Sequence, residues 1–352
     1  MLNELISMLP KSADGVLIVS ETNRRYFTDF PSSDGILLAT RNGSVFLTDS
    51  RYIEEAQNIV KCCEVQELKK VSEQLPELCH KFGVRVLMAE AERLTVAQLS
   101  VYRKLLKGIT VTTVGTDKII DTLRMVKRDF EIESVTKAQR IAEKALDHAL
   151  GTIEVGVTER ELALTLDFFM LKNGAQAVSF ETIAISGANT SKPHGVPTDK
   201  KIERGDFVTM DFGAVVNGYH SDMTRTVAVG EVSDEQVRVY NTVLEAQLKA
   251  LDILKAGVKC SDADACARIY INEKGYGDYF RHSLGHGVGL EIHEKPNLSP
   301  KSEQVLEEGN IVTVEPGIYI PGKFGVRIED MATIAKFSCE NLTKFTKKLA
   351  IL

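Results

Sequence analysis

The chain has 352 residues, of which 43% are hydrophobic and 26% are charged, and its formal net charge is −6. That size exceeds one typical hydrophobic core, so we expect two globular domains. The pI near 5.8 gives no basic footprint for nucleic acid, and no apolar run approaches a membrane span, so neither partner is expected.

The first part of the chain alternates short apolar runs with amphipathic segments. Runs at 16–20, 84–89 and 109–114 predict strands, and two more runs flanking Asn42-Gly43 predict a hairpin. Amphipathic helices are expected over 53–60 and 96–106. This alternation predicts a small α/β domain over residues 1–124.

The six cysteines form no Cys-x-x-Cys motif, and we expect reduced thiols. The amino-terminal stretch lacks the basic and apolar regions of a secretory signal. Together these features favour a cytoplasmic location.

A polar segment at 121–133 marks the expected domain boundary, and a second domain is expected over 125–352. The segment opens a helix whose apolar positions run from Val135 to Leu146. The next helix is expected to begin at the capping box formed by Thr158 and Glu161 and to end near 173–174.

A third helix is expected to begin at Ser233, with a capping box to Gln236. We expect its apolar stripe to pack in the core rather than to form a binding groove. The stripe consists of Val237, Tyr240, Leu244, Leu248 and Leu251.

The first pair of acids lies in the segment VTMDFGAVVNGYHSDMTRT. Asn217-Gly218 is a strong signal for a two-residue hairpin turn. Partners across an antiparallel pair share a face of the sheet. With that turn, Asp211 opposes Thr224 and lies diagonal to Asp222 on the same face, so the two carboxylates converge.

A weaker copy follows in VTVEPGIYIPGKFGVRIEDM, and the frames GDFVTMDFG and GNIVTVEPG predict two αββ-like halves related by a pseudo-twofold axis. A three-residue loop at 321–323 puts Glu315 directly opposite Glu329. Four converging carboxylates repel one another unless divalent cations supply compensating charge. The duplication therefore predicts a metal site. The alternative is that Asp211 and Glu329 are ordinary acids at strand ends.

Between the copies, the glycine-rich run GYGDYFRHSLGHGVGLEIHEKP holds three of the seven histidines, namely His282, His286 and His293. Imidazole beside carboxylates favours Mn, Co, Fe or Zn over Mg or Ca. In one alternative, His282 and His286 form a structural Zn pair on a helix, which the glycines in the run oppose. In another, these are core histidines.

These motifs, together with SKPHG at 191–195, resemble the Xaa-Pro peptidases, that is prolidase (Xaa-Pro dipeptidase) and aminopeptidase P. That group belongs to the pita-bread superfamily with methionine aminopeptidase and creatinase. The resemblance is strong over 125–340 and looser before it. It implies an α/β N-terminal domain of the creatinase/prolidase type, followed by an α+β pita-bread catalytic domain.

The resemblance further implies a dinuclear centre that binds two divalent ions, Mn²⁺ or Co²⁺, with Zn²⁺ and Fe²⁺ as alternatives. Asp211 would chelate the first ion, Asp222 and Glu329 would bridge both, and His286 with Glu315 would complete the second. By the same resemblance, Glu315 would also carry a proton from the attacking water to the leaving nitrogen.

Four further residues are matched to the family by motif position. His194 and His293 match the two histidines that line the substrate pocket, while His282 and Arg327 match other active-site positions. The expected reaction is hydrolysis of the Xaa-Pro bond at the N-terminus of dipeptides or short peptides by a hydroxide that bridges the ions. Similar enzymes cover the site of a dimer mate with their N-terminal domain, so a homodimer is expected.

The sequence leaves alternative functions open. The chain has no Gly-x-Ser-x-Gly elbow and no cysteine in a histidine-rich setting, which disfavours covalent catalysis. Within the same fold, a methionine aminopeptidase would lack the extra N-terminal domain, and a creatinase-type enzyme would lack the complete ligand set. A catalytically inactive binding protein would typically have lost ligands.

Overall fold

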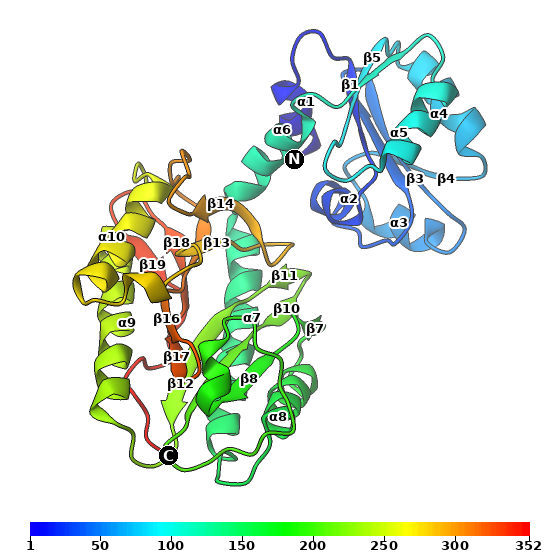
Figure 1. Cartoon of the computed structure of the whole chain (residues 1–352). Helices are drawn as coiled ribbons and strands as arrows, with labels where there is room; N and C mark the ends of the chain where they lie inside the picture. The colour runs from blue at the N-terminus through cyan, green and yellow to red at the C-terminus, as the bar shows by residue number, and fades with distance from the viewer. The chain divides into compact units, whose positions relative to one another are not determined.

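The computed structural model describes residues 1–352. The chain forms two compact units, Met1–Arg124 and Met125–Leu352 (Figure 1). None of its helices combines the length and the apolar character that crossing a bilayer requires.

The first unit is built on one six-stranded sheet in the order β4-β3-β2-β1-β5-β6, coloured blue to cyan in Figure 1. Strands β1, β2 and β3 pair antiparallel and the other neighbours pair parallel. Its elements are α1 (Leu2–Met8), β1 (Gly15–Ile18), α2 (Glu21–Thr28), β2 (Ile36–Thr40), β3 (Gly43–Thr48), α3 (Ile53–Ile59), β4 (Glu64–Glu67), α4 (Val71–Lys81), β5 (Val86–Ala89), α5 (Val96–Leu105), β6 (Thr110–Thr112) and α6 (Thr116–Met125).

The predicted strands, the two predicted helices and the hairpin of the first unit are confirmed, although the hairpin turn is 41–42, one residue earlier than predicted. The sequence does not predict α1, α2, β4, α4 or α6. Strand β4 reads Glu-Val-Gln-Glu and is not fully buried at any position, so it carries little apolar signal. Helix α4 contains Pro76 in its interior, where proline destabilises a helix. It forms nonetheless, because Leu75 and Leu78 are buried in the core against the sheet.

The second unit contains two successive groups of elements, each with two helices followed by strands. The first group comprises α7 (Asp129–Leu150), α8 (Glu159–Lys172), β7 (Ala177–Val178), β8 (Ile183–Ser186), the 3-10 helix η1 (Gly187–Ser191), β9 (Phe207–Phe212), β10 (Ala214–Val216), β11 (Tyr219–His220) and β12 (Met223–Ala228). The second comprises α9 (Asp234–Ile253), α10 (Cys260–Glu273), η2 (Gly277–Tyr279), β13 (Gly285–Gly287), β14 (Glu294–Leu298), β15 (Ile311–Val314), β16 (Gly317–Ile320), β17 (Phe324–Arg327), β18 (Asp330–Ile334) and β19 (Cys339–Asn341).

Each half has its own hydrophobic core. Helices α7 and α8 pack on β8, β9, β10 and β12, while α9 and α10 pack on the strands that run from β14 to β18. The two helix pairs are drawn in teal to green and in yellow in Figure 1. This duplicated arrangement confirms the predicted fold class, in which a mixed α/β N-terminal domain precedes an α+β unit built from two similar halves.

The helix boundaries of the second unit follow the predicted caps. Thr158 and Ser233 both accept a hydrogen bond from the backbone of the third residue on, and the reciprocal side-chain bonds complete both capping boxes. The predicted stripe on α9 is wrong at two positions, because Val237 is 37% exposed and Leu248 is 40% exposed. The buried positions are Val239, Tyr240, Thr242, Val243, Ala246, Gln247 and Ala250.

Small side chains explain that error. Helix α9 packs through Ala246 and Ala250, which are fully buried in the core that it shares with α10. A prediction that follows the largest apolar residues overlooks such a face, because close approach of two helices favours small residues at the contact.

The two halves meet along a seam between β12 and the segment before β18. The backbone N–H of Glu329 donates to the carbonyl of Thr224 at 3.2 Å. The buried guanidinium of Arg225 donates Nη1 to the carbonyls of both residues, at 2.6 Å for Glu329 and 2.9 Å for Thr224, and its Nη2 pairs with the buried Asp330 at 2.8 Å. These bonds fix one half against the other at the place where the acids lie.

Candidate metal centre

The first pair of acids lies in the predicted hairpin. Val216 pairs with Tyr219, so the turn is Asn217-Gly218, and both turn residues have positive φ, at 53° and 78°. This geometry is typical of a type I′ turn. On the neighbouring strands Asp211 pairs with Thr224, so the predicted register is confirmed.

The second pair of acids lies where a hairpin ladder is interrupted. Ile320 pairs with Phe324 across the loop 321–323, and Val314 pairs with Asp330 in the same register. Between these ladders, Glu315 and Glu329 leave regular pairing. The N–H of Glu315 donates to the carbonyl of Leu284 at 2.8 Å, and that of Glu329 donates to Thr224 in the other half. At the interruption, Glu315 is therefore tied to the residue before β13 and Glu329 to β12.

A cavity of about 670 Å³ in the second unit brings the two pairs together. All nine residues singled out in the sequence line it. They are the acids Asp211, Asp222, Glu315 and Glu329, the histidines His194, His282, His286 and His293, and Arg327.

Three groups in this cavity are close enough to share one ion. Ligand atoms of Asp222, His286 and Glu329 all lie within 4.8 Å of one another. Asp222 and Glu329 are 4% and 2% exposed. Buried acids this close require either protons or a cation between them.

The electrostatics of the acids express this requirement. Burial raises the pKa of Asp222 and of Glu329 well above the usual value, and their neighbouring carboxylates raise both further. Burial likewise raises the pKa of Glu315 to about 8, although Arg327 opposes the shift. Without cations these carboxylates would hold protons near neutral pH. Raised pKa values of this kind are typical of a site that binds cations.

His286 presents a lone pair to the acids. Burial lowers its pKa to about 4, so the ring is neutral. Its Nδ1 lies 3.1 Å from the carbonyl of Gly287; a carbonyl only accepts, so Nδ1 carries the proton. Nε2 therefore faces Asp222 and Glu315 unprotonated, at 3.6 and 3.5 Å. Three acceptors facing one another suit a metal ion, and the backbone carbonyl fixes the ring as metal-binding histidines require.

Asp211 is held differently. One of its oxygens pairs with the guanidinium of Arg327, and the other, Oδ1, is buried without a hydrogen-bond partner. An unsatisfied buried carboxylate oxygen is costly. Oδ1 therefore supplies an open ligand position at the edge of the acid cluster, and the donor set as a whole fits divalent cations.

Tyr319, which sequence reasoning missed, links Arg327 to His282. The Tyr319 hydroxyl accepts from Nη1 of Arg327 at 2.8 Å and lies 3.0 Å from Nε2 of His282. The other ring nitrogen of His282 lies 2.9 Å from the carbonyl of Ser283 and must donate, so Tyr319 donates to Nε2. The signal in the sequence is the position of Tyr319 within VEPGIY, one residue before the end of β16.

The two remaining histidines line the same cavity from segments that lie far apart in the sequence. The His293 ring stands edge-on to His286, with centroids 4.4 Å apart. His194 is exposed and lies on the loop that follows η1. Its neighbour Pro193 accepts a hydrogen bond from Arg327 at 3.1 Å. Both imidazoles therefore line the cavity that holds the acids. The contacts of His286 with Asp222 and Glu315 are its own.

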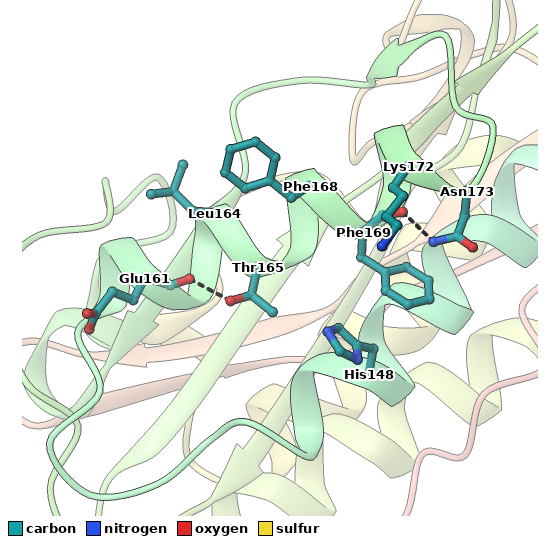
Figure 2. Close-up of a pocket in the computed structure, with 8 residues that line it drawn as sticks. All are labelled: His148, Glu161, Leu164, Thr165, Phe168, Phe169, Lys172 and Asn173. Carbon is teal, nitrogen blue, oxygen red and sulfur yellow. Dashed lines mark hydrogen bonds between the residues drawn. The ribbon is translucent and has the colours of Figure 1, made fainter.

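A second cavity, of about 630 Å³, lies on α7 and α8, away from the acid cluster. Figure 2 shows Leu164 and Phe168 on α8 and the ring of Phe169 against His148. The two rings stack at 4.8 Å. Glu161 is the one acid that lines this cavity, and its carboxylate belongs to the cap of α8. This cavity lacks the convergent polar groups of a catalytic site.

Comparisons with known proteins match both units. Residues 133–336 match the model of metallopeptidase family M24, and residues 7–126 match that of the creatinase/prolidase N-terminal domain. A relative named Xaa-Pro dipeptidase, from Pyrococcus horikoshii, is 40% identical over 98% of this chain and 97% of its own.

Solved structures resemble the whole chain. A structure described as Xaa-Pro dipeptidase from Bacillus anthracis has a TM-score of 0.96 and 43% identity, and covers 100% of this chain and 99% of that one. A structure described as X-Pro aminopeptidase from Thermotoga maritima has a TM-score of 0.92 and 38% identity, and covers 97% of this chain and 98% of that one.

Proposed function

The chain belongs to metallopeptidase family M24, and from that premise we propose that it hydrolyses the peptide bond between an N-terminal residue and proline, in dipeptides or short peptides. The observation that carries the proposal is the convergence of four carboxylates and the unprotonated Nε2 of His286 on one cavity. The relatives carry both dipeptidase and aminopeptidase names, so the length of the substrate is left to the experiment below.

Five residues would hold two divalent ions: Asp211, Asp222, His286, Glu315 and Glu329. The raised pKa values of the buried acids support this assignment, as does the open Oδ1 of Asp211. Imidazole together with carboxylate ligands favours Mn²⁺ or Co²⁺, with Zn²⁺ and Fe²⁺ as alternatives. When bound, the ions would activate water at neutral pH and polarise the scissile carbonyl.

The chain's own groups would then orient the substrate and move protons. Glu315 would take the proton of the attacking water and deliver it to the leaving nitrogen. His194 and His293 would donate hydrogen bonds to the peptide carbonyl as negative charge develops on its oxygen. The hydrogen bonds that link Arg327 to Tyr319 and Tyr319 to His282 would keep the guanidinium and the imidazole in place.

The preference for proline has a physical basis. An Xaa-Pro bond has no N–H, so an enzyme that must accept a hydrogen bond from the amide N–H of its substrate cannot cleave it. Nothing in the proposed mechanism needs that hydrogen. The lining of the cavity also includes apolar side chains that would accept the pyrrolidine ring: Phe180, Ile183, Val196, Pro197 and Ile292.

The test compares three substrates with protein that has been stripped by a chelator and reloaded with Mn²⁺ or Co²⁺. We expect Ala-Pro or Ala-Pro-Ala to be cleaved by the reloaded protein and neither by the stripped protein. Ala-Ala is the control that lacks proline. The ratio of the first two rates decides between dipeptidase and aminopeptidase. Failure to bind any divalent ion and to cleave either proline substrate would overturn the proposal.

A further inference from the structure

The segment that carries His194 is a loop tied down at both ends by one buried side chain. This His194 loop, residues 187–198, follows β8 and begins with η1. His194 itself is exposed, so the position of its imidazole over the cavity depends on the backbone of the loop.

Glu159, the first residue of α8, holds the two ends of the His194 loop. Its side chain is buried and only 1% of the residue is exposed. Oε1 accepts from the backbone and hydroxyl of Ser186, at 2.7 and 3.1 Å, and from Asn189 at 3.0 Å. Oε2 accepts from the backbone and hydroxyl of Thr198, at 3.0 and 2.7 Å. One oxygen thus holds the start of the loop and the other holds its end.

These contacts require the ionised carboxylate. Burial opposes ionisation of Glu159, but the hydrogen bonds from Asn189, Thr198 and Ser186 outweigh it and hold the pKa below the usual value. Every group that faces the two oxygens is a donor. A carboxylate accepts at both oxygens, whereas an amide would turn an NH₂ group toward one set of donors.

The opposite side of the loop is held by β17, which belongs to the second half of the second unit, the catalytic unit. Arg327 donates to the carbonyl of Pro193, directly before His194, at 3.1 Å. The N–H of Gly325 donates to the hydroxyl of Thr190 at 2.8 Å. A Cβ at position 325 would stand 2.2 Å from the carbonyl oxygen of Thr190, so the two backbone segments are in close contact. The loop is therefore fixed between Glu159 and the strand that bears Arg327.

We propose that Glu159 is a positioning residue for peptide hydrolysis: by clamping residues 186 and 198 it holds the His194 imidazole where the substrate carbonyl binds. This inference rests on the proposed function and adds to it a residue that touches neither substrate nor metal. The same loop carries Val196 and Pro197, which line the cavity, so loosening it would also change KM. The signature specific to the His194 imidazole is therefore the effect on kcat.

The signature is a double-mutant cycle with E159Q and H194A. Alone, E159Q should lower kcat on Ala-Pro by about 10- to 100-fold, since misplacing a catalytic group by about 1 Å has effects of that size. In the H194A background, E159Q should change kcat less than 2-fold, because the catalytic group that it positions is gone. Metal content should stay unchanged in every variant. Independent, multiplying effects of the two substitutions would overturn the proposal.

A second readout does not need activity. Amide hydrogen exchange over residues 187–198 should accelerate in E159Q and stay unchanged in E161Q, whose glutamate lies on the same helix but caps Thr158 outside the loop. If exchange in the loop is the same in E159Q and in the parent, the proposal is wrong whatever the activity. If the parent cleaves no Xaa-Pro substrate while E159Q does loosen the loop, the proposed function fails and the clamp itself stands.

Discussion

Asp222 and Arg327 occupy equivalent positions in the two halves of the catalytic unit. Arg327 pairs with Gly317, and the ladders on either side of Asp222 place it opposite Gly213. Gly213 is the last residue of the frame GDFVTMDFG, and Gly317 is the last residue of its copy GNIVTVEPG. One half therefore supplies an acid where the other supplies a cation, and the site is asymmetric although the backbone is duplicated.

The same equivalence relates Thr224 to Glu329, and it leads to the first prediction. The Thr224 hydroxyl donates to Glu329 at 2.7 Å and accepts from Nε of Arg327 at 3.0 Å. Thr224→Val removes both bonds without changing the shape of the side chain. We expect metal affinity to fall by about 10- to 100-fold, as for other groups that support a ligand.

The control for that variant is Thr226→Val. Thr226 is equally buried on the same strand, and its hydroxyl contacts Thr209 and the backbone of Arg327 rather than an acid. This variant should lose about 1 kcal/mol of stability and bind metal as the parent does. Competition with a chelator measures both affinities, and equal losses in the two variants would contradict the support assigned to Thr224.

Asp222→Asn should separate metal binding from folding. The amide cannot replace a carboxylate ligand, so kcat/KM should fall by about 10³-fold through the loss of several kcal/mol of charge stabilisation. In the metal-free protein the same change removes a buried carboxyl group whose ionisation is opposed by burial and by Glu329. The melting temperature of the metal-free variant should therefore equal or exceed that of the metal-free parent, while added Mn²⁺ no longer raises it. Parental activity would refute the ligand assignment.

His293→Ala tests a group that is proposed to touch the substrate. The His293 ring packs against His286 but is not among the five proposed ligands. We expect kcat to fall while two ions per chain remain bound, as measured by elemental analysis. His148→Ala, in the cavity on α7 and α8, is the matched histidine control and should leave kcat unchanged. Loss of an ion from His293→Ala would instead make His293 a ligand.

The metal-free protein should lose stability as the pH rises above neutrality. Burial raises the folded pKa of Glu315 to about 8 from its ordinary value of 4.5. A carboxyl with a raised folded pKa contributes stability that is present below its unfolded value and is lost as the pH rises through the folded value.

Two partly buried histidines act in the opposite direction but at lower pH. The pKa of His282 and that of His286 fall to about 4 from 6.5, so their contribution is lost only as the pH drops below 6.5. The melting temperature of the metal-free protein should therefore decline from pH 6.5 to 8.5. Bound metal should abolish the decline, since it replaces the protons. A flat profile for the metal-free protein would contradict the raised carboxyl pKa.

The hairpins were predictable because their signals are local. A two-residue Asn-Gly turn and the alternation of strand side chains determine which residues face each other, so the pairing of Asp211 with Thr224 followed by counting. The prediction for α9 failed at Val237 and Leu248, because the face that a helix buries depends on how closely its partners approach.

Groups that support the site could not be predicted in the same way. Thr224, Tyr319 and Glu159 owe their roles to contacts across large separations in sequence, such as the bond from Thr224 to Glu329. A hydroxyl in a strand or a glutamate at a helix start has an ordinary local explanation. Only the assembled fold distinguishes a supporting side chain from a helix cap or a strand residue.

The seam between the two halves has a consequence for how the unit unfolds. Arg225 and the backbone of Glu329 bind both halves at the acids, so an ion held there would act as a cross-link between them. Loading the site should therefore merge any separate melting of the halves into one cooperative transition. A backbone nick at 229–233 should leave two fragments that reassociate more tightly when Mn²⁺ is present.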